Sequence, residues 1–221
     1  MNPTDHLPDS RLEELTVQIQ SGDQKALGPV FEVYRQRLQA AIRMRVNSRI
    51  RQREDESDIL QEAFFSAAKD LPRYSKEPKV PVYVWLRGIV QQRLVDIHRK
   101  HLSSQKRTLE REVSINRPQF PVSDSCSIAG QIADDLTSPS LLASKAELRA
   151  IVQTVLEQLE PLDREIISLR HIEGLKSSDV AAVLQINQST ASTRYLRALK
   201  KLKDGLSVVL KSENDDSNAL F

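Results

Sequence analysis

Residues 177–202 read SSDVAAVLQINQSTASTRYLRALKKL, two short helical patterns separated by a brief break. In the first pattern Val180 and Leu184 share an apolar face, and Ser177 or Ser178 can cap its N-terminus. Two interpretations fit this stretch. It is either an ordinary helical hairpin with a solvated basic face, or a helix-turn-helix that places its second helix in the major groove of DNA.

The second pattern carries the chemistry that DNA recognition needs. Hydroxyl and amide groups can hydrogen-bond to base edges, while Arg and Lys neutralise phosphates. The candidate DNA-contacting residues are Gln188, Ser189, Thr190, Thr193, Arg194, Arg197 and Lys200. Leu196 stands on the same side as these polar residues. Spacing alone leaves both interpretations open, because short amphipathic helix pairs are common.

The composition predicts an all-α fold. The 221 residues include only 6 glycines, and 28% of them are charged, which is typical of a mostly helical chain. We expect two small helical domains joined by a flexible linker, the C-terminal one a helix-turn-helix. The single cysteine, Cys126, excludes an intramolecular disulfide. Because the N-terminus is polar and no stretch is apolar enough to cross a bilayer, we expect a cytoplasmic protein without membrane insertion.

Periodicity and composition suggest where the domains begin and end. Between the two helical blocks lies a stretch rich in proline and serine, with no lasting period. After it, Pro161 suits a first helical turn and Gly174 a C-terminal cap. The predicted organisation is a tail at 1–10, a helical domain at 11–102, a linker at 103–144, a helix-turn-helix domain at 145–210 and an acidic tail at 211–221.

Charge is segregated along the chain although the net charge is only +2. Seven arginines and no acid occur between Val33 and Arg53, and this run could meet DNA or only water. An acidic patch follows at 54–58 and leads into a predicted helix that Asp58 caps and Pro72 ends. One face of that helix is apolar. The other carries acids with one aromatic residue, Phe65, which is unusual for plain surface.

A second helix is predicted from about Pro81 to His101. Its period places Trp85 in the core and projects Arg87, Arg93, Arg99 and Lys100 to solvent. His98 and His101 have the spacing of a metal-binding pair. Their basic neighbours favour phosphate contact over a metal, and we expect no metal and no cofactor.

A family resemblance joins these blocks. The stretch LEQLEPLDREIISLRHIEGLKSSDVAAVLQINQSTASTRYLRALKKL resembles region four of bacterial sigma factors of the sigma-70 family, in particular the extracytoplasmic-function (ECF) group. DESDILQEAFFSAAKDL resembles the core-binding helix of region two, and VWLRGIVQQRLVDIHRK resembles the promoter-reading helix that follows it. The blocks occur in the family's order and cover most of the chain outside the tails and the linker.

The resemblance implies a transcription initiation factor that binds core RNA polymerase, reads the −10 and −35 promoter elements and assists DNA melting. Residues implied to dock on the polymerase clamp helices are Asp55, Asp58, Gln61, Glu62 and Phe65. Residues implied to contact the downstream element are Tyr74, Tyr83, Arg87, Arg93, Arg99 and Lys100, where the tyrosines would stack on unpaired bases. The helix-turn-helix residues would read the upstream element.

Alternatives remain at this stage. A stand-alone helix-turn-helix regulator would explain the C-terminal block but not the acidic, polymerase-like helix. An enzyme has no site to build on, because the four histidines are scattered and no glycine-rich phosphate loop is present. Many members of the family are held inactive by an anti-sigma factor, and no residue here identifies such a partner.

Overall fold

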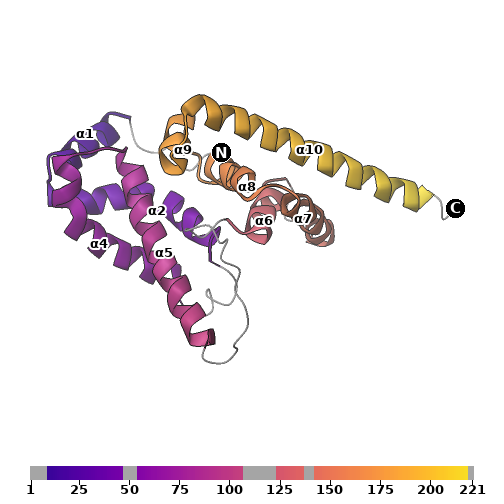
Figure 1. Cartoon of the computed structure of the whole chain (residues 1–221), viewed down its shortest axis with the longest axis horizontal. Helices are drawn as coiled ribbons and strands as arrows, with labels where there is room; N and C mark the ends of the chain where they lie inside the picture. The colour runs from indigo at the N-terminus through magenta and orange to yellow at the C-terminus, as the bar shows by residue number, and fades with distance from the viewer. Residues whose placement is uncertain (1–8, 47–53, 107–122, 137–141, 219–221) are drawn as a thin grey trace. The chain divides into compact units, whose positions relative to one another are not determined.

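The computed structural model describes residues 9–46, 54–106, 123–136 and 142–218, and these are helices joined by turns (Figure 1). The chain divides into two units, Met1–Val122 and Ser123–Phe221, each with its own buried core. This confirms the predicted all-α class with two helical domains. In the part of the chain that is described, no helix has the length and apolarity that crossing a bilayer requires.

The first unit is built around three helices. Its elements are α1 (Asp9–Gln20), a 3₁₀ turn η1 (Gln24–Ala26), α2 (Leu27–Arg43), α4 (Glu56–Lys76) and α5 (Val82–Lys106). Helices α2, α4 and α5 pack against one another, and α1 packs on α2 and α4. Leu38, Ile59, Leu86 and Leu94 are fully buried between them. Their apolar period therefore decides which face of each helix enters the core.

Helix α4 differs from its prediction at both ends. It is capped by Asp55 and not by Asp58, because the Asp55 side chain accepts a hydrogen bond from the Ser57 backbone N–H at 2.9 Å. Pro72 does not end the helix, which continues to Lys76. A proline inside a helix costs about 3 kcal/mol. Burial of Leu71 and Tyr74 on either side of it offsets that cost.

The second unit holds the helix-turn-helix. Its elements are α6 (Ser125–Leu136), α7 (Leu142–Glu157), α8 (Pro161–Ile167), a π-helical turn η2 (Ser168–Ile172), α9 (Ser177–Leu184) and α10 (Gln188–Asn218). Helix α10 packs on α7, α8 and α9. As predicted, Pro161 opens α8, and Gly174 follows η2 with a φ of 64°, in the left-handed region that glycine tolerates.

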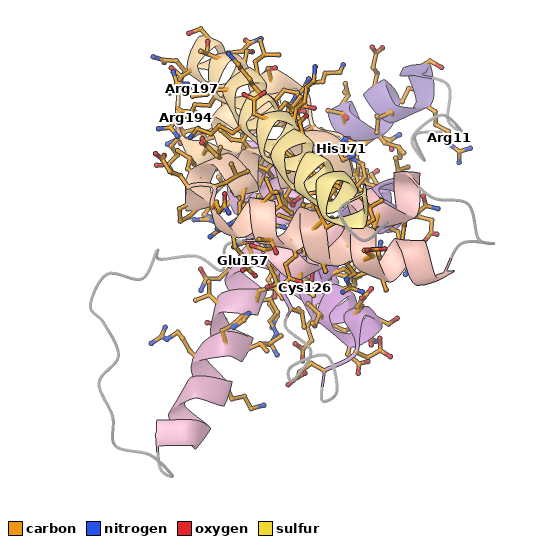
Figure 2. The ribbon with its side chains drawn as sticks, turned by 90° about the vertical axis from the view of Figure 1, so that its right-hand side faces the viewer. Arg11, Cys126, Glu157, His171, Arg194 and Arg197 are labelled. Atoms are coloured by element: carbon orange, nitrogen blue, oxygen red, sulfur yellow. The ribbon has the colours of Figure 1, made fainter. Side chains whose placement is uncertain are left out.

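The predicted linker at 103–144 is wrong at its two ends and at 125–136, which are helical, whereas 107–122 and 137–141 lie outside the described residues. Helix α5 continues to Lys106, α7 begins at Leu142, and α6 lies inside the segment and carries Cys126 (Figure 2). Helix α6 packs on α7 because its apolar residues share one face and are buried. These residues are Ile128, Ala129, Ile132 and Ala133. The domain that carries the helix-turn-helix therefore begins before residue 145.

The predicted acidic tail at 211–221 is also helical for most of its length, because α10 continues to Asn218. No described contact explains this extension. The predicted N-terminal tail at 1–10 lies almost entirely outside the described residues, and α1 begins at Asp9.

The turn of the helix-turn-helix is fixed by backbone geometry. Gln185 ends α9 with a φ of 54°, and the Ile186 N–H donates to the Ala181 carbonyl at 3.0 Å. Helix α9 begins after Lys176 without a side-chain cap, so the predicted Ser177 or Ser178 cap is not used. Helix α10 starts three residues after Gln185, and the sharp turn reverses the chain onto it.

Candidate functional site

The residues predicted to bind polymerase lie together on α4. Asp58, Gln61, Glu62 and Phe65 are exposed at helical spacings of three and four, and Asp55 caps the same end of the helix. The Phe65 ring is 55% exposed, which is high for an aromatic side chain. An acidic surface with one exposed ring is therefore present, and we call these five residues the α4 face.

A pocket of about 440 Å³ adjoins the α4 face, between α2 and α4. Its lining is mostly apolar and includes Phe31, Leu60, Phe64 and Phe65. Phe64 makes edge-to-face contacts with Phe31 at 5.2 Å and with Phe65 at 6.0 Å between ring centroids. The exposed ring of Phe65 therefore continues an aromatic row that leads into the core.

The four cations predicted on α5 differ in their exposure. Arg87 is buried, whereas Arg99 and Lys100 are exposed toward the C-terminal part of the helix. Arg93 forms an ion pair with Glu62 of the α4 face, so the two predicted surfaces share a contact. The prediction that Arg87 projects to solvent is wrong, because the side chain is buried.

Tyr74 and Tyr83 do not offer their rings for base stacking. Both are buried, at 5% and 3% exposed. Tyr74 stacks on Trp85 at 4.3 Å between centroids, and its hydroxyl donates to the Val80 carbonyl at 2.7 Å. The Arg37 guanidinium covers the Tyr83 ring at 4.2 Å. The predicted stacking role therefore has no support in these contacts, whereas the predicted core position of Trp85 agrees with its burial.

Asp70 of α4 holds Trp85 of α5 in this aromatic cluster, a contact that no sequence pattern indicated. It accepts hydrogen bonds from Trp85 Nε1 at 2.9 Å and from Arg73 Nε at 2.7 Å. The bond from Arg73 lowers the pKa of Asp70 from its ordinary value, burial partly opposes this shift, and Trp85 adds to it. Burial raises the pKa of Tyr74 to about 12. The cluster orients the start of α5.

The arginine run has partners inside the first unit wherever it is described. Arg35 pairs with Glu32 at 2.8 Å, Arg43 pairs with Glu56 at 3.2 Å, and Arg45 donates to the Ala41 carbonyl. The three arginines at 49, 51 and 53 lie outside the described residues. His98, half of the histidine pair, is held by the Arg45 carbonyl at 3.0 Å. These contacts give the described arginines structural roles.

The candidate DNA-contacting residues all lie in the first turns of α10. Six of the seven are exposed, five of them being Gln188, Ser189, Thr190, Thr193 and Arg197. Lys200 is exposed one turn further along. Arg194 and Arg197 lie close together on this part of the helix (Figure 2). Arg194 differs from the others, because it is only 29% exposed.

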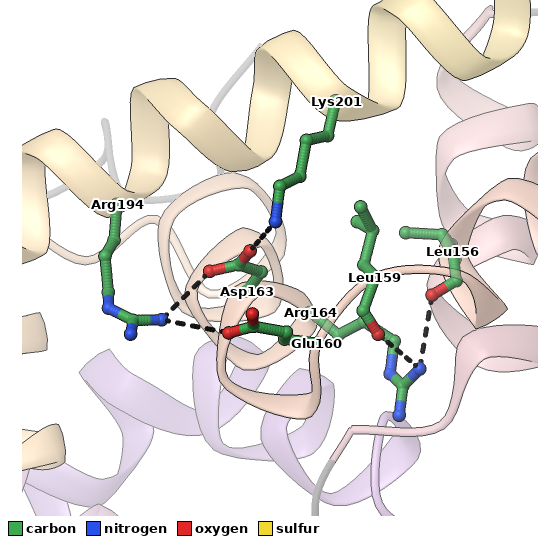
Figure 3. Close-up of polar contacts among 7 residues, drawn as sticks. All are labelled: Leu156, Leu159, Glu160, Asp163, Arg164, Arg194 and Lys201. Carbon is green, nitrogen blue, oxygen red and sulfur yellow. Dashed lines mark hydrogen bonds and ion pairs between the residues drawn. The ribbon is translucent and has the colours of Figure 1, made fainter.

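Asp163 explains the burial of Arg194 (Figure 3). Its carboxylate, 2% exposed, accepts hydrogen bonds from Arg194 Nη1 at 3.1 Å and Lys201 Nζ at 2.9 Å. Glu160 lies 3.6 Å from the same Arg194 atom. A buried carboxylate of α8 therefore clamps two cations of α10. The sequence did not reveal this contact, because an acid in the first turn of a helix is usually a capping or dipole residue.

Further polar contacts hold the second unit together around α10. Arg164 Nη1 donates to the carbonyls of Leu156 and Leu159 at 3.2 and 3.0 Å, which satisfies the C-terminal end of α7 (Figure 3). The Arg170 guanidinium lies 5.1 Å from the Tyr195 ring centre and donates to the Leu175 carbonyl. Helix α10 is thus held from α8 through Asp163 and from η2 through Arg170.

Two protein-family models match the chain, one in each unit. "Sigma-70 region 2" matches residues 30–107, and "Sigma-70, region 4" matches residues 149–202. The first match contains α4 and α5, and the second contains α8 to the start of α10.

The chain belongs to the sigma-70 family. It is a transcription initiation factor of the ECF group, as the sequence resemblance implied. Initiation factors of this family bind core RNA polymerase and promoter DNA and do not themselves carry out covalent chemistry. A stand-alone regulator is not favoured, because it would leave the match to region 2 unexplained.

Curated relatives are similar to this sigma factor over nearly their full length. The ECF RNA polymerase sigma-E factor of Escherichia coli K12 is 27% identical, with 89% of this chain and 95% of the relative covered. The RNA polymerase sigma-H factor of Pseudomonas aeruginosa is 24% identical, covering 90% and 95%. The sigma factor SigD of Mycobacterium tuberculosis H37Rv is 26% identical, covering 92% and 88%.

A solved structure shares the fold. It is described as CnrH in complex with the cytosolic domain of CnrY, and it aligns with a TM-score of 0.52 at 24% identity. The alignment covers 88% of this sigma factor and 96% of CnrH.

Proposed function

We propose that this sigma factor docks on the clamp helices of core RNA polymerase through the α4 face, reads the downstream promoter element with α5 and reads the upstream element with α10. The observation that carries the proposal is the α4 face itself. It presents three carboxylates and an exposed Phe65 ring beside an apolar pocket. Such a surface suits a partner helix that offers basic side chains to the carboxylates and an apolar side chain to Phe65 and the pocket.

Charge and aromatic contact would make different contributions at this surface. Carboxylates complementary to a basic partner speed association and fix register more than they add affinity. An exposed aromatic residue at the centre of an interface is the type of side chain that dominates binding energy. We therefore assign the affinity to Phe65 and the orientation to Asp55, Asp58 and Glu62.

DNA contact would be divided between the two units. Arg99 and Lys100 of α5 would neutralise phosphates of the downstream element, and the residues at the start of α10 would meet base edges and phosphates of the upstream element. Within the upstream set, Arg194 acts through the position of α10, because Asp163 holds it. Engagement of the downstream element would assist DNA melting.

A regulatory partner fits the same proposal. CnrH, which shares the fold, was solved bound to a domain of another protein. An anti-sigma factor that covers the α4 face would compete with polymerase for Phe65. All of this would take place in the cytoplasm, where polymerase meets the chromosome.

The test is binding to bacterial core RNA polymerase, measured by co-migration and by titration of a labelled sigma factor. We expect a stoichiometric complex with the wild type and weaker complexes with Asp58→Arg and Phe65→Ala. Loss of an aromatic anchor worth ~2 kcal/mol lowers affinity by about 30-fold.

Matched control variants come from α1, to which no polymerase or DNA contact is assigned. Glu13 is an exposed acid, and Val17 is a 64% exposed apolar residue. Glu13→Arg and Val17→Ala should bind polymerase as the wild type does. If the α1 and α4 variants behave alike, or if no complex forms while the protein still binds DNA, the proposed polymerase surface is wrong.

A further inference from the structure

Leu196 is an apolar side chain in an unusual place. It is 67% exposed, and among the described residues only Val17 and Phe65 are comparably exposed large apolar side chains. Phe65 already belongs to the α4 face. Leu196 lies on the other unit, in the part of α10 that carries the predicted DNA contacts.

The position of Leu196 on the helix places it at the centre of the outward face. Ser189, Thr193 and Lys200 precede or follow it by seven, three and four residues, so they share its side of the helix, and all three are exposed. The opposite side is buried through Ala191, Ala198 and Leu202. Leu196 therefore lies away from the margin of the core, in the middle of an exposed polar strip formed by Ser189, Thr193 and Lys200.

The polar strip has fewer cations available for DNA than the sequence suggests. Arg194 lies toward the buried side and is bound by Asp163 at 3.1 Å, with Glu160 at 3.6 Å. Lys201 is bound by the same carboxylate at 2.9 Å. Thr193, Leu196, Arg197 and Lys200 therefore form the surface that a DNA groove would meet.

The chemistry of the major groove offers one partner for an aliphatic side chain. Each base pair presents donors and acceptors there, and only thymine adds an apolar group, its C5-methyl. We propose that Leu196 is a specificity-determining residue that packs on a thymine methyl in the upstream promoter element. This inference rests on the proposed function, because it requires α10 to enter that element.

Polar and charged side chains of α10 lie on either side of Leu196. Thr193 lies one turn before Leu196 and Arg197 is the next residue, so a hydroxyl and a guanidinium flank the apolar side chain. The flanking groups can bond to the adjacent base edge and to the phosphate while Leu196 covers the methyl. Burying one methyl group against an aliphatic side chain corresponds to about fourfold in affinity.

The test removes the methyl without changing the hydrogen-bond pattern. Holoenzyme is assembled from the full chain and core polymerase, and bound duplexes are selected from a random library. Each thymine of the enriched upstream block is then replaced by deoxyuridine, and the affinity is measured for the wild type, Leu196→Ala, Leu196→Met and the control Val17→Ala. Circular dichroism verifies that every variant is folded.

The expected result is one thymine at which deoxyuridine weakens wild-type binding by about fourfold. Leu196→Ala should abolish that difference, Leu196→Met should retain it, and Val17→Ala should behave as the wild type. An undiminished deoxyuridine effect in Leu196→Ala, or no sensitive thymine at all, overturns the inference alone. Failure of the holoenzyme to enrich any sequence overturns the proposed function and this inference with it.

Discussion

Replacing Asp163 by alanine should destabilise the second unit by about 3 kcal/mol. The side chain is 2% exposed and accepts two charge-assisted hydrogen bonds, from Arg194 and Lys201. Each such bond is worth ~1.5 to 3 kcal/mol. We use the lower value, because Arg194 and Lys201 are 29% and 43% exposed and water can solvate both after the carboxylate is removed.

The assay separates the two units by their spectroscopic signals. The only tryptophan, Trp85, lies in the first unit, so its fluorescence follows that unit, whereas far-UV circular dichroism follows both. For Asp163→Ala in urea or on heating, the circular dichroism transition of the second unit should move. A loss of 3 kcal/mol in a domain of this size lowers Tm on the order of 15 °C. The Trp85 transition should stay in place.

Glu160 provides the matched control for Asp163. It approaches the same guanidinium of Arg194, but its side chain is 65% exposed. Exposed ion pairs contribute ~0 to 1 kcal/mol, so Glu160→Ala should be almost neutral. Equal effects of the two substitutions, or an Asp163→Ala protein as stable as the wild type, would refute the claim that burial makes this carboxylate the anchor of α10.

Further predictions concern packing and pH. Gly205→Ala should destabilise the second unit, because the added Cβ would lie 2.6 Å from Cγ1 of the buried Val155. Gly88→Ala should stabilise the first unit by up to ~1 kcal/mol, because its Cβ would have no neighbour within 4 Å and alanine favours a helix over glycine. Thermal unfolding of both variants measures these changes in stability. Burial raises the pKa of Tyr74 to about 12, so its contribution to stability is complete below the unfolded-state pKa of ~10 and is lost as pH rises through 12. Trp85 fluorescence in urea across that range should show a smaller alkaline loss in Tyr74→Phe, and an identical loss would contradict the assignment.

Much of this architecture follows from local patterns. The α4 face could be predicted because a helix with one apolar and one acidic side must turn its apolar side to the core and its acidic side to solvent. The helix-turn-helix could be predicted because each of its two helices has a clear apolar face. Helix α6 could not be predicted in the same way. Its buried pairs Ile128–Ala129 and Ile132–Ala133 alternate with serine, glycine and glutamine, and this short pattern gains stability by packing on α7 and η2.

The contacts that the sequence did not reveal are mostly tertiary. Asp163 meets Arg194 and Lys201 across 31 and 38 residues of chain, and no spacing rule connects them. Tyr74 and Tyr83 carry aromatic rings that could stack on bases, but α5 packs against α4 and both rings are buried. Pro72 was expected to end α4, but burial on either side of it keeps the helix intact.

The proposed roles of the two units are tested most directly by comparing the DNA sequences that the protein selects with and without core RNA polymerase. With polymerase, we predict enrichment of duplexes that carry two sequence blocks at a fixed separation, one for each unit. Phe65→Ala should reduce this enrichment, and Val17→Ala should not. Enrichment of a single block that does not depend on polymerase would contradict the account, because the second unit would then act alone.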